Sequence, residues 1–145
     1  AAFVRKFHEA KLSNADTVTC WGTGSPLREF LHVDDLSDAV KFVLENWDPK
    51  ENSFQDESKN NIFYLNVGTG KDITIKELAE KISKKMNYQG QIIWDNSKPD
   101  GTPRKQLDVY KLKELGWQPK IDLNQGIDLT IKSFKQELIS KTCRL

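Results

Sequence analysis

The strongest candidate for binding chemistry is a short loop, residues 97–105, which reads SKPDGTPRK. Two prolines and a glycine mark it as irregular, and it carries the cations Lys98, Arg104 and Lys105. Prolines restrict the free loop, so fewer degrees of freedom are lost when its basic groups close on an anion. Asp100 can accept a hydrogen bond from a sugar or ribose hydroxyl. The loop therefore predicts a local anion-binding site.

A second candidate is the stretch WGTGSPLREF, residues 21–30, in which a glycine- and proline-bearing loop separates Trp21 from Arg28. An indole offers a flat apolar face, and a planar guanidinium can bind two oxygens at once. This pair suits a ligand that has both a ring and a phosphate. The alternative is a core tryptophan with an unrelated surface arginine.

The GTGK segment, residues 68–71, invites a phosphate-loop interpretation but does not fit one. A Walker loop requires a glycine where Leu65 stands and a serine or threonine where Asp72 stands. The dinucleotide pattern fails too, because Ile73 occupies the place of its third glycine. We expect a plain strand-to-helix turn here, and we predict no cofactor-binding residue in this chain.

Acid–base and nucleophilic groups are sparse. The two histidines are best explained structurally, His8 as a solvated helix residue and His32 as a residue bonded to nearby backbone or carboxylate. Asp34 and Asp35 form a pair of carboxylates, but they stand where acidic side chains cap and stabilise a helix start. We therefore predict no catalytic residue.

Bulk properties narrow the class of protein. The 145 residues include 22 basic and 21 acidic side chains, a formal net charge of +1 that argues against nucleic-acid binding. No apolar run approaches the roughly 18 residues that span a bilayer, so no membrane association is expected. Cys20 and Cys143 show no metal-type spacing, which predicts no metal site and a reducing, cytoplasmic setting with Cys20 buried.

Hydrophobic periodicity and turn signals divide the chain into elements. The strands expected are 17–22, 61–67 and 91–95, with a polar, exposed loop over 48–61. The helices expected are 3–14, one following Asp34, one from 75 with a Thr74–Glu77 capping box, a short one closed by Gly116, and 123–138.

This order predicts an α/β fold: a small mixed α–β domain over residues 1–145, with too few strands for a complete doubly wound sheet. The helix after Asp34 carries an apolar stripe. If part of the sheet lies outside this chain, that stripe is uncovered and the chain self-associates or repacks. The residues concerned are Val40, Val43, Leu44 and Trp47.

Three blocks, at these positions and in this order, resemble the carboxy-terminal portion of the GDP-L-fucose synthases, a branch of the extended short-chain dehydrogenase/reductase family. They are WGTGSPLREFLHVDDLSDAV, NVGTGKDITIKELAEKI and SKPDGTPRKQLDV. The resemblance covers nearly the whole chain. It implies NADP-dependent 3,5-epimerisation and 4-reduction of GDP-4-keto-6-deoxy-mannose in a cytoplasmic homodimer.

The resemblance also implies how the work is divided. The family's NADP loop, its Tyr-x-x-x-Lys pair and its epimerising residues belong to an amino-terminal Rossmann half, and this chain contains no YxxxK. NADP is thus expected in that half, and this chain alone is expected to be inactive. The substrate contacts carried over are Lys6, Trp21, Arg28, Asp100 and Lys105.

Three alternatives remain open at this point. In the first, the chain is a stand-alone, non-catalytic nucleotide-sugar-binding module. In the second, it belongs to another NAD(P)-dependent nucleotide-sugar epimerase or dehydratase. The third alternative is a structural or interaction domain with an incidental basic loop. All but the third require the guanidinium of Arg28 and the ammonium of Lys105 to converge on one surface.

Overall fold

The computed structural model describes residues 2–51 and 54–140. The described chain forms two compact units, each built from separate stretches of sequence. The first unit takes residues 2–28, 73–105 and 124–140, and the second takes residues 29–72 and 106–123. The single domain predicted over residues 1–145 stays a prediction.

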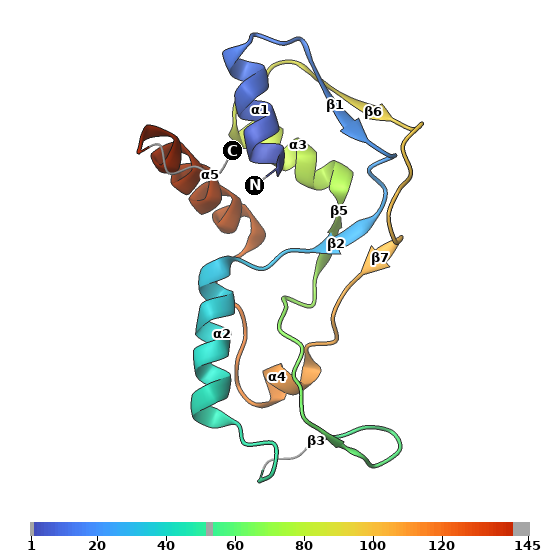
Figure 1. Cartoon of the computed structure of the whole chain (residues 1–145), viewed down its shortest axis with the longest axis vertical. Coiled ribbons are helices and arrows are strands. Elements are labelled where there is room, and N and C mark those ends of the chain that lie inside the picture. The colour runs from blue at the N-terminus through green and yellow to red at the C-terminus, as the bar shows by residue number, and fades with distance from the viewer. Residues whose placement is uncertain (1, 52–53, 141–145) are drawn as a thin grey trace. The chain divides into compact units, whose positions relative to one another are not determined.

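The first unit contains most of the regular structure (Figure 1). Its helices are α1 (Ala2–Leu12), α3 (Ile75–Lys85) and α5 (Leu123–Ile139). Its strands are β1 (Thr17–Trp21), β6 (Gln91–Asp95), β7 (Arg104–Lys105) and most of β2 (Leu27–Glu29) and β5 (Asp72–Thr74). The end residues Glu29 and Asp72 belong to the second unit. The predicted helices 3–14, from 75, and 123–138 are confirmed, as are the strands 17–22 and 91–95.

The strands of this unit form two small sheets. β1 pairs in parallel with β6, from Thr17 opposite Gln91 to Trp21 opposite Asp95. The other sheet has the order β5-β2-β7, and the β2–β7 pair is again parallel. Sequence periodicity did not predict this second sheet, because its strands are only two or three residues long and too short to show alternation.

The core of the first unit lies where α1 packs against α3 and β1. Phe7 is fully buried, and its ring centroid lies 5.4 Å from that of Tyr88. The Tyr88 hydroxyl donates to the carbonyl of Ala15 at 2.9 Å, so this buried polar tip is satisfied. On α3, the predicted capping box between Thr74 and Glu77 is present in both directions.

The second unit contains α2 (Val33–Asn46), β3 (Phe54–Gln55), β4 (Asn61–Ile62) and α4 (Tyr110–Glu114). Its core is built on Ala39, Leu112 and Trp117. The predicted short helix is α4, and Gly116 follows it with φ +105°, a left-handed conformation that ends a helix. Of the strand predicted over 61–67, only Asn61–Ile62 is a strand, and Phe63 and Tyr64 are exposed.

Part of the polar stretch 48–61 forms an antiparallel hairpin, β3 with β4, while residues 52–53 of that stretch lie outside the described chain. The carboxylate of Asp56 accepts from the backbone amides of Ser58 and Asn60, both at 2.9 Å, and so closes the hairpin turn. Together with the side-chain amide of Asn60, these donors lower the pKa of Asp56.

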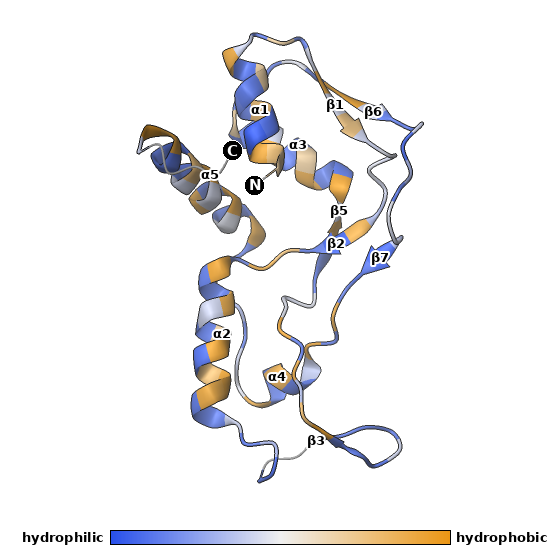
Figure 2. Ribbon diagram, viewed as in Figure 1, coloured by the Kyte–Doolittle hydropathy of each residue, from blue (hydrophilic) through white to orange (hydrophobic). Residues whose placement is uncertain are grey.

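The apolar stripe of α2 is only partly uncovered. Val40 is 50% exposed and Leu44 is 80% exposed, as predicted, whereas Val43 packs against the Ala39–Leu112–Trp117 core and Trp47 is half-buried. Figure 2 shows hydrophobic, orange residues alternating with hydrophilic, blue ones along α2. Self-association through this stripe stays a prediction.

Candidate nucleotide-sugar site

All five residues predicted to contact a substrate lie in the first unit. They fall into two groups. Lys6 on α1 and Trp21 on β1 line one hollow, while Arg28 on β2 and Lys105 on β7 occupy neighbouring strands. Asp100, in the loop before β7, lies next to the residue that follows Trp21.

Arg28 and Lys105 face each other across a strand pair. In the parallel register of β2 and β7, Arg28 is the direct partner of Lys105, and Leu27 is the partner of Arg104. Neighbouring strands lie about 4.8 Å apart, and directly paired residues project to the same side of a sheet. The register thus places an arginine and a lysine opposite each other on neighbouring strands, and their joint binding of an anion stays a prediction.

The Arg28 guanidinium is held in place by its own strand and by the basic loop. One terminal nitrogen, Nη1, donates to the carbonyl of Leu27 at 2.6 Å. The other, Nη2, lies 3.1 Å from the place that a Cβ on Gly101 would take, so the guanidinium packs against the backbone of the 97–105 loop. The half-buried arginine therefore has little rotamer freedom left to lose on binding an anion.

Asp100 is bonded to the loop that follows β1. The backbone amide of Thr23 donates to Asp100 Oδ1 at 2.9 Å, and the Thr23 hydroxyl donates to Oδ2 at 2.6 Å. These bonds stabilise the carboxylate and lower the pKa of Asp100. Asp100 was predicted to accept a hydroxyl of the ligand, and the structure adds an internal partner that the sequence did not indicate.

Trp21 stands at the end of β1 with 72% of its surface exposed, so it is not a core tryptophan. The ammonium of Lys98 lies 5.8 Å from the centre of its ring, within cation–π range. The next residue is Gly22, with φ +77°, and a Cβ there would clash with the Asp100 carboxylate. The basic loop thus approaches the chain at Trp21 and Gly22 closely.

Lys6 belongs to a hollow of about 580 Å³ between α1 and β1, lined by Lys6, Glu9, Thr19 and Trp21 among others. The Lys6 ammonium donates to the carbonyl of Thr19 at 2.6 Å. An ammonium carries three donors, so this bond leaves capacity for a ligand. Lys6 and Trp21 therefore line the same hollow, and a substrate-binding role for them stays a prediction.

The GTGK turn is structural, in agreement with its sequence. The backbone amides of Thr69 and Gly70 both donate to Oε1 of Glu29, and the amide of Leu107 donates to Oε2 at 3.0 Å. A Cβ on Gly68 would also clash with this carboxylate. The loop is an anion-binding nest whose anion is a side chain of the same unit, so it does not fit a dinucleotide phosphate.

The two histidines have structural surroundings. Nδ1 of His32 accepts from the amide of Asp34 at 3.3 Å, which makes His32 the N-cap of α2 and confirms its predicted role. His8 is half-buried, and its ring lies edge-on to Phe134 at 5.4 Å between centroids. The expectation of a solvated His8 is therefore wrong, because α5 supplies an apolar neighbour.

The paired carboxylates stand in the first turn of α2, where they favour the helix dipole as predicted, but neither is the N-cap. The helix is capped by His32, and Asp34 and Asp35 lie within its first turn. Asp35 is 3% exposed and accepts from the amides of Lys120 and Ile121 at 3.1 and 2.9 Å. It anchors the segment after α4, a role that depends on residues some 85 positions away in sequence.

Cys20 is buried, as predicted, and burial raises the pKa of its thiol, although Lys6 acts in the opposite direction. A raised pKa disfavours the thiolate, so Cys20 is an inert core residue. Cys143 lies outside the described residues. Within residues 2–51 and 54–140, His, Cys, Asp and Glu nowhere cluster in a set of three that could hold a metal ion.

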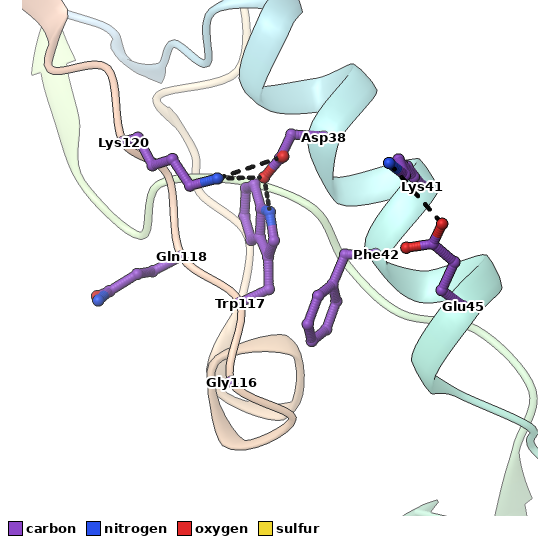
Figure 3. Close-up of a pocket in the computed structure, with 8 residues that line it drawn as sticks. All are labelled: Asp38, Lys41, Phe42, Glu45, Gly116, Trp117, Gln118 and Lys120. Carbon is purple, nitrogen blue, oxygen red and sulfur yellow. Dashed lines mark hydrogen bonds and ion pairs between the residues drawn. The ribbon is translucent and has the colours of Figure 1, made fainter.

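The second unit has a hollow of its own, about 400 Å³ in volume, beside α2 (Figure 3). Asp38 accepts from the indole of Trp117 at 2.9 Å and from the ammonium of Lys120 at 3.1 Å. These bonds lower the pKa of Asp38, the Trp117 bond most strongly. Because its carboxylate is already satisfied by core and surface partners, this hollow is best explained as packing around Trp117.

No helix in the described part of the chain combines the length and the apolar character that a bilayer crossing requires.

The residues that sequence reasoning missed are Thr23 and Glu29. Thr23 lies in the loop after β1 and Glu29 ends β2, and only the fold brings their partners close. The two glycines that flank Thr23, Gly22 and Gly24, were the local sequence feature that marked a turn there.

Comparison with known proteins bears out the resemblance. The NAD dependent epimerase/dehydratase family matches residues 1–55. The probable GDP-L-fucose synthase 1 of Oryza sativa subsp. japonica is 50% identical over 139 residues, which are 96% of this chain and 39% of that protein. The GDP-L-fucose synthase of Escherichia coli (strain K12) is 46% identical over 133 residues, 92% of this chain and 40% of that protein.

Among solved structures, the GDP-mannoheptose C4 reductase from Campylobacter jejuni, determined with NADP bound, matches with a TM-score of 0.77 and 34% identity. The match covers 92% of this chain and 43% of that one. The chain spans about two fifths of the length of the curated relatives that it matches. Over nearly its whole length it is similar to the GDP-L-fucose synthases, and its fold is that of the carboxy-terminal part of extended short-chain dehydrogenase/reductase proteins.

Proposed function

We propose that this chain is the GDP-sugar-binding, carboxy-terminal part of an NADP-dependent GDP-L-fucose synthase. The intact enzyme epimerises GDP-4-keto-6-deoxy-mannose at C3 and C5 and reduces it at C4. The observation that carries the proposal is the direct pairing of Arg28 with Lys105 beside the 97–105 loop. Two unlike cations at one edge of a small sheet suit a diphosphate, which spreads its negative charge over several oxygens.

Each of the five residues has a role in this proposal. Arg28 and Lys105 neutralise the diphosphate, and the exposed indole of Trp21 packs against a ring of the nucleotide sugar. Asp100 accepts a hydrogen bond from a hydroxyl of the ligand. A carboxylate has about four acceptor positions, so the two Thr23 bonds leave room for this one. Lys6 supplies a further donor from the hollow beside Trp21.

These residues bind and orient, and the chemistry is assigned to groups outside this chain. NADP supplies the hydride in the family, but the Gly68–Gly70 turn directs its amides at Glu29 and does not fit the cofactor. NADP would be held by residues outside this chain, where it would supply the hydride. The present residues contribute by holding a charged substrate in one orientation, which lowers the entropy cost of a later reaction.

The partners and setting follow from the same proposal. The chain acts together with an amino-terminal Rossmann half in a cytoplasmic homodimer. The similarity of the chain to about two fifths of each relative supports a longer natural protein. Size-exclusion chromatography with light scattering on the intact protein tests the dimer, and a monomeric mass at all concentrations would contradict it.

A non-catalytic nucleotide-sugar-binding module is the second candidate, favoured by the placement of all five residues within one compact unit. Calorimetric titration of GDP-mannose into the isolated chain and into the intact protein separates the two candidates. Micromolar binding by the isolated chain supports the module. Binding only by the intact protein, together with NADPH-dependent reduction of the keto sugar, supports the synthase.

A further inference from the structure

Thr23 joins the loop after β1 to the basic loop before β7 through a carboxylate. Its amide and its hydroxyl bond separate oxygens of Asp100, at 2.9 and 2.6 Å, across 77 residues of sequence. A two-point bond of this kind fixes both the position and the rotation of the carboxylate. We propose that Thr23 is a positioning residue of the GDP-sugar site, acting through Asp100 on the 97–105 loop. This inference rests on the function proposed above.

The direction of each hydrogen bond follows from the chemistry of the groups. An ionised carboxylate only accepts, so the Thr23 hydroxyl must donate its proton to Asp100. The same hydroxyl oxygen then accepts from the amide of Ser25 at 3.1 Å, and it lies 2.7 Å from the Ser25 hydroxyl. Ser25 therefore holds the Thr23 hydroxyl in the orientation that serves Asp100.

The backbone permits this close approach at one residue. Gly22 adopts φ +77°, and its missing side chain leaves the space that the Asp100 carboxylate occupies. On the other side of Asp100, Gly101 lies against Nη2 of Arg28. Asp100 is therefore bonded to Thr23 while its neighbour contacts the arginine that we assign to the diphosphate.

The hydrogen bonds to Asp100 predict its charge and its orientation toward a ligand. Asp100 remains ionised well below neutral pH, because the Thr23 bonds lower its pKa. Thr23 bonds each oxygen once and the Ser25 side chain adds a weaker bond, so the remaining acceptor positions point in directions that these partners have fixed. A sugar or ribose hydroxyl thus finds an oriented acceptor, and its orientation costs nothing further at the moment of binding.

The test is a set of variants of the intact protein, titrated with GDP-mannose by calorimetry. Thr23→Val keeps the side-chain shape and removes the hydroxyl, and we expect affinity to fall about tenfold, the usual scale for a lost bond to a charged group. Thr23→Ser restores the hydroxyl and should recover most of the affinity. Ser25→Ala should have a smaller effect of the same sign, because the Ser25 hydroxyl contacts the Thr23 hydroxyl and contributes less than Thr23 to stabilising the Asp100 carboxylate.

A double-mutant cycle shows whether Thr23 affects binding through Asp100 or only through the stability of the fold. If Thr23 acts through Asp100, then Thr23→Val should cost nothing further in an Asp100→Ala background. Thr130→Val is the matched control, because that hydroxyl bonds only the Gly126 carbonyl within α5. Circular dichroism and thermal melts check that each variant is folded. If Thr23→Val does not fold, the affinity of Ser25→Ala for GDP-mannose is measured in its place.

The outcomes distinguish this inference from the function on which it rests. Weakened binding by Thr23→Val, rescued by serine and absent in the Asp100→Ala background, supports it. Unchanged affinity for Thr23→Val and Ser25→Ala, with Arg28→Ala strongly weakened, overturns the role of Thr23 and leaves the GDP-sugar site standing. Unchanged affinity for Arg28→Ala overturns the proposed function and this inference with it.

Discussion

Two loops of this protein, residues 68–70 and 97–105, both contain glycine and both could bind an anion. The first already binds a carboxylate of the chain, whereas the second carries exposed cations. In the first, backbone amides converge on the carboxylate of Glu29, which belongs to the same unit. In the second, the loop leads into Lys105, which is exposed beside Arg28. An anion-binding geometry is therefore not evidence of a ligand until the chain's own carboxylates have been excluded as the anion.

The largest difference between the two loops is expected at their cations. We expect Arg28→Ala to weaken GDP-mannose binding by the intact protein about a hundredfold, the scale for truncating one partner of a charged contact. Lys71→Ala, in the GTGK segment, is the matched control and should leave affinity unchanged, because that loop already holds Glu29. Calorimetry measures both. Equal losses for the two variants would show that both loops bind the ligand.

The internal anion can be neutralised next. Glu29→Gln removes a charge that accepts from the amides of Thr69, Gly70 and Leu107. We expect the free energy of unfolding to fall by about 1–3 kcal/mol, the cost of weakening hydrogen bonds to a charged acceptor. Urea denaturation measures the change. An unaltered midpoint would mean that the nest does not depend on its carboxylate.

The capping box of α3 provides the scale for a local effect on stability, because its hydrogen bonds join only Thr74 and Glu77. Thr74→Ala removes the side-chain half of the capping box on α3, where Thr74 accepts from the Glu77 amide at 3.1 Å. The expected loss of stability is about 1 kcal/mol. Thermal melts should register this loss while GDP-mannose affinity stays constant. A large fall in affinity would indicate that α3 supports the site.

The smallest expected effect concerns pH. The pKa of Asp100 is lowered in the folded protein, so its contribution to stability is present above the unfolded pKa and is lost as pH falls through the folded value. Between neutral pH and about 5, above the ordinary range near 4, Asp100 stays ionised. GDP-mannose affinity should be nearly constant there, and calorimetry at several pH values checks this. A decline in that interval, absent from Asp100→Ala, would contradict the lowered pKa.

Local signals predicted the elements, and distant partners escaped prediction. The Thr74–Glu77 box and the helix over 123–138 depend on residues three or four apart, such as the buried Ile127, Ile131 and Phe134, so the sequence predicted both. β2 and β7 are too short to show periodicity, yet they set Arg28 opposite Lys105. The two cations were predicted from their types and motifs, and their adjacency depends on strand pairing.

The same reason explains the missed or altered roles of acidic residues. Asp35 reads as a helix-start carboxylate, but its partners are the amides of Lys120 and Ile121. Glu29 looks like a surface residue between Arg28 and Phe30, and its partners lie about 40 and 78 residues away. A side chain that bonds distant backbone amides leaves no local pattern, because any residue type can supply an amide.

The Thr23–Asp100 link spans 77 residues, and this separation has a consequence for biosynthesis. At translation rates of 5–20 residues per second, roughly 4 to 15 seconds pass between the synthesis of the two partners. During that interval the nascent chain carries β1 without β6 and β2 without β7. Unpaired strand edges invite association with other chains, so β1 and β2 are most prone to wrong pairing before residue 105 has been made.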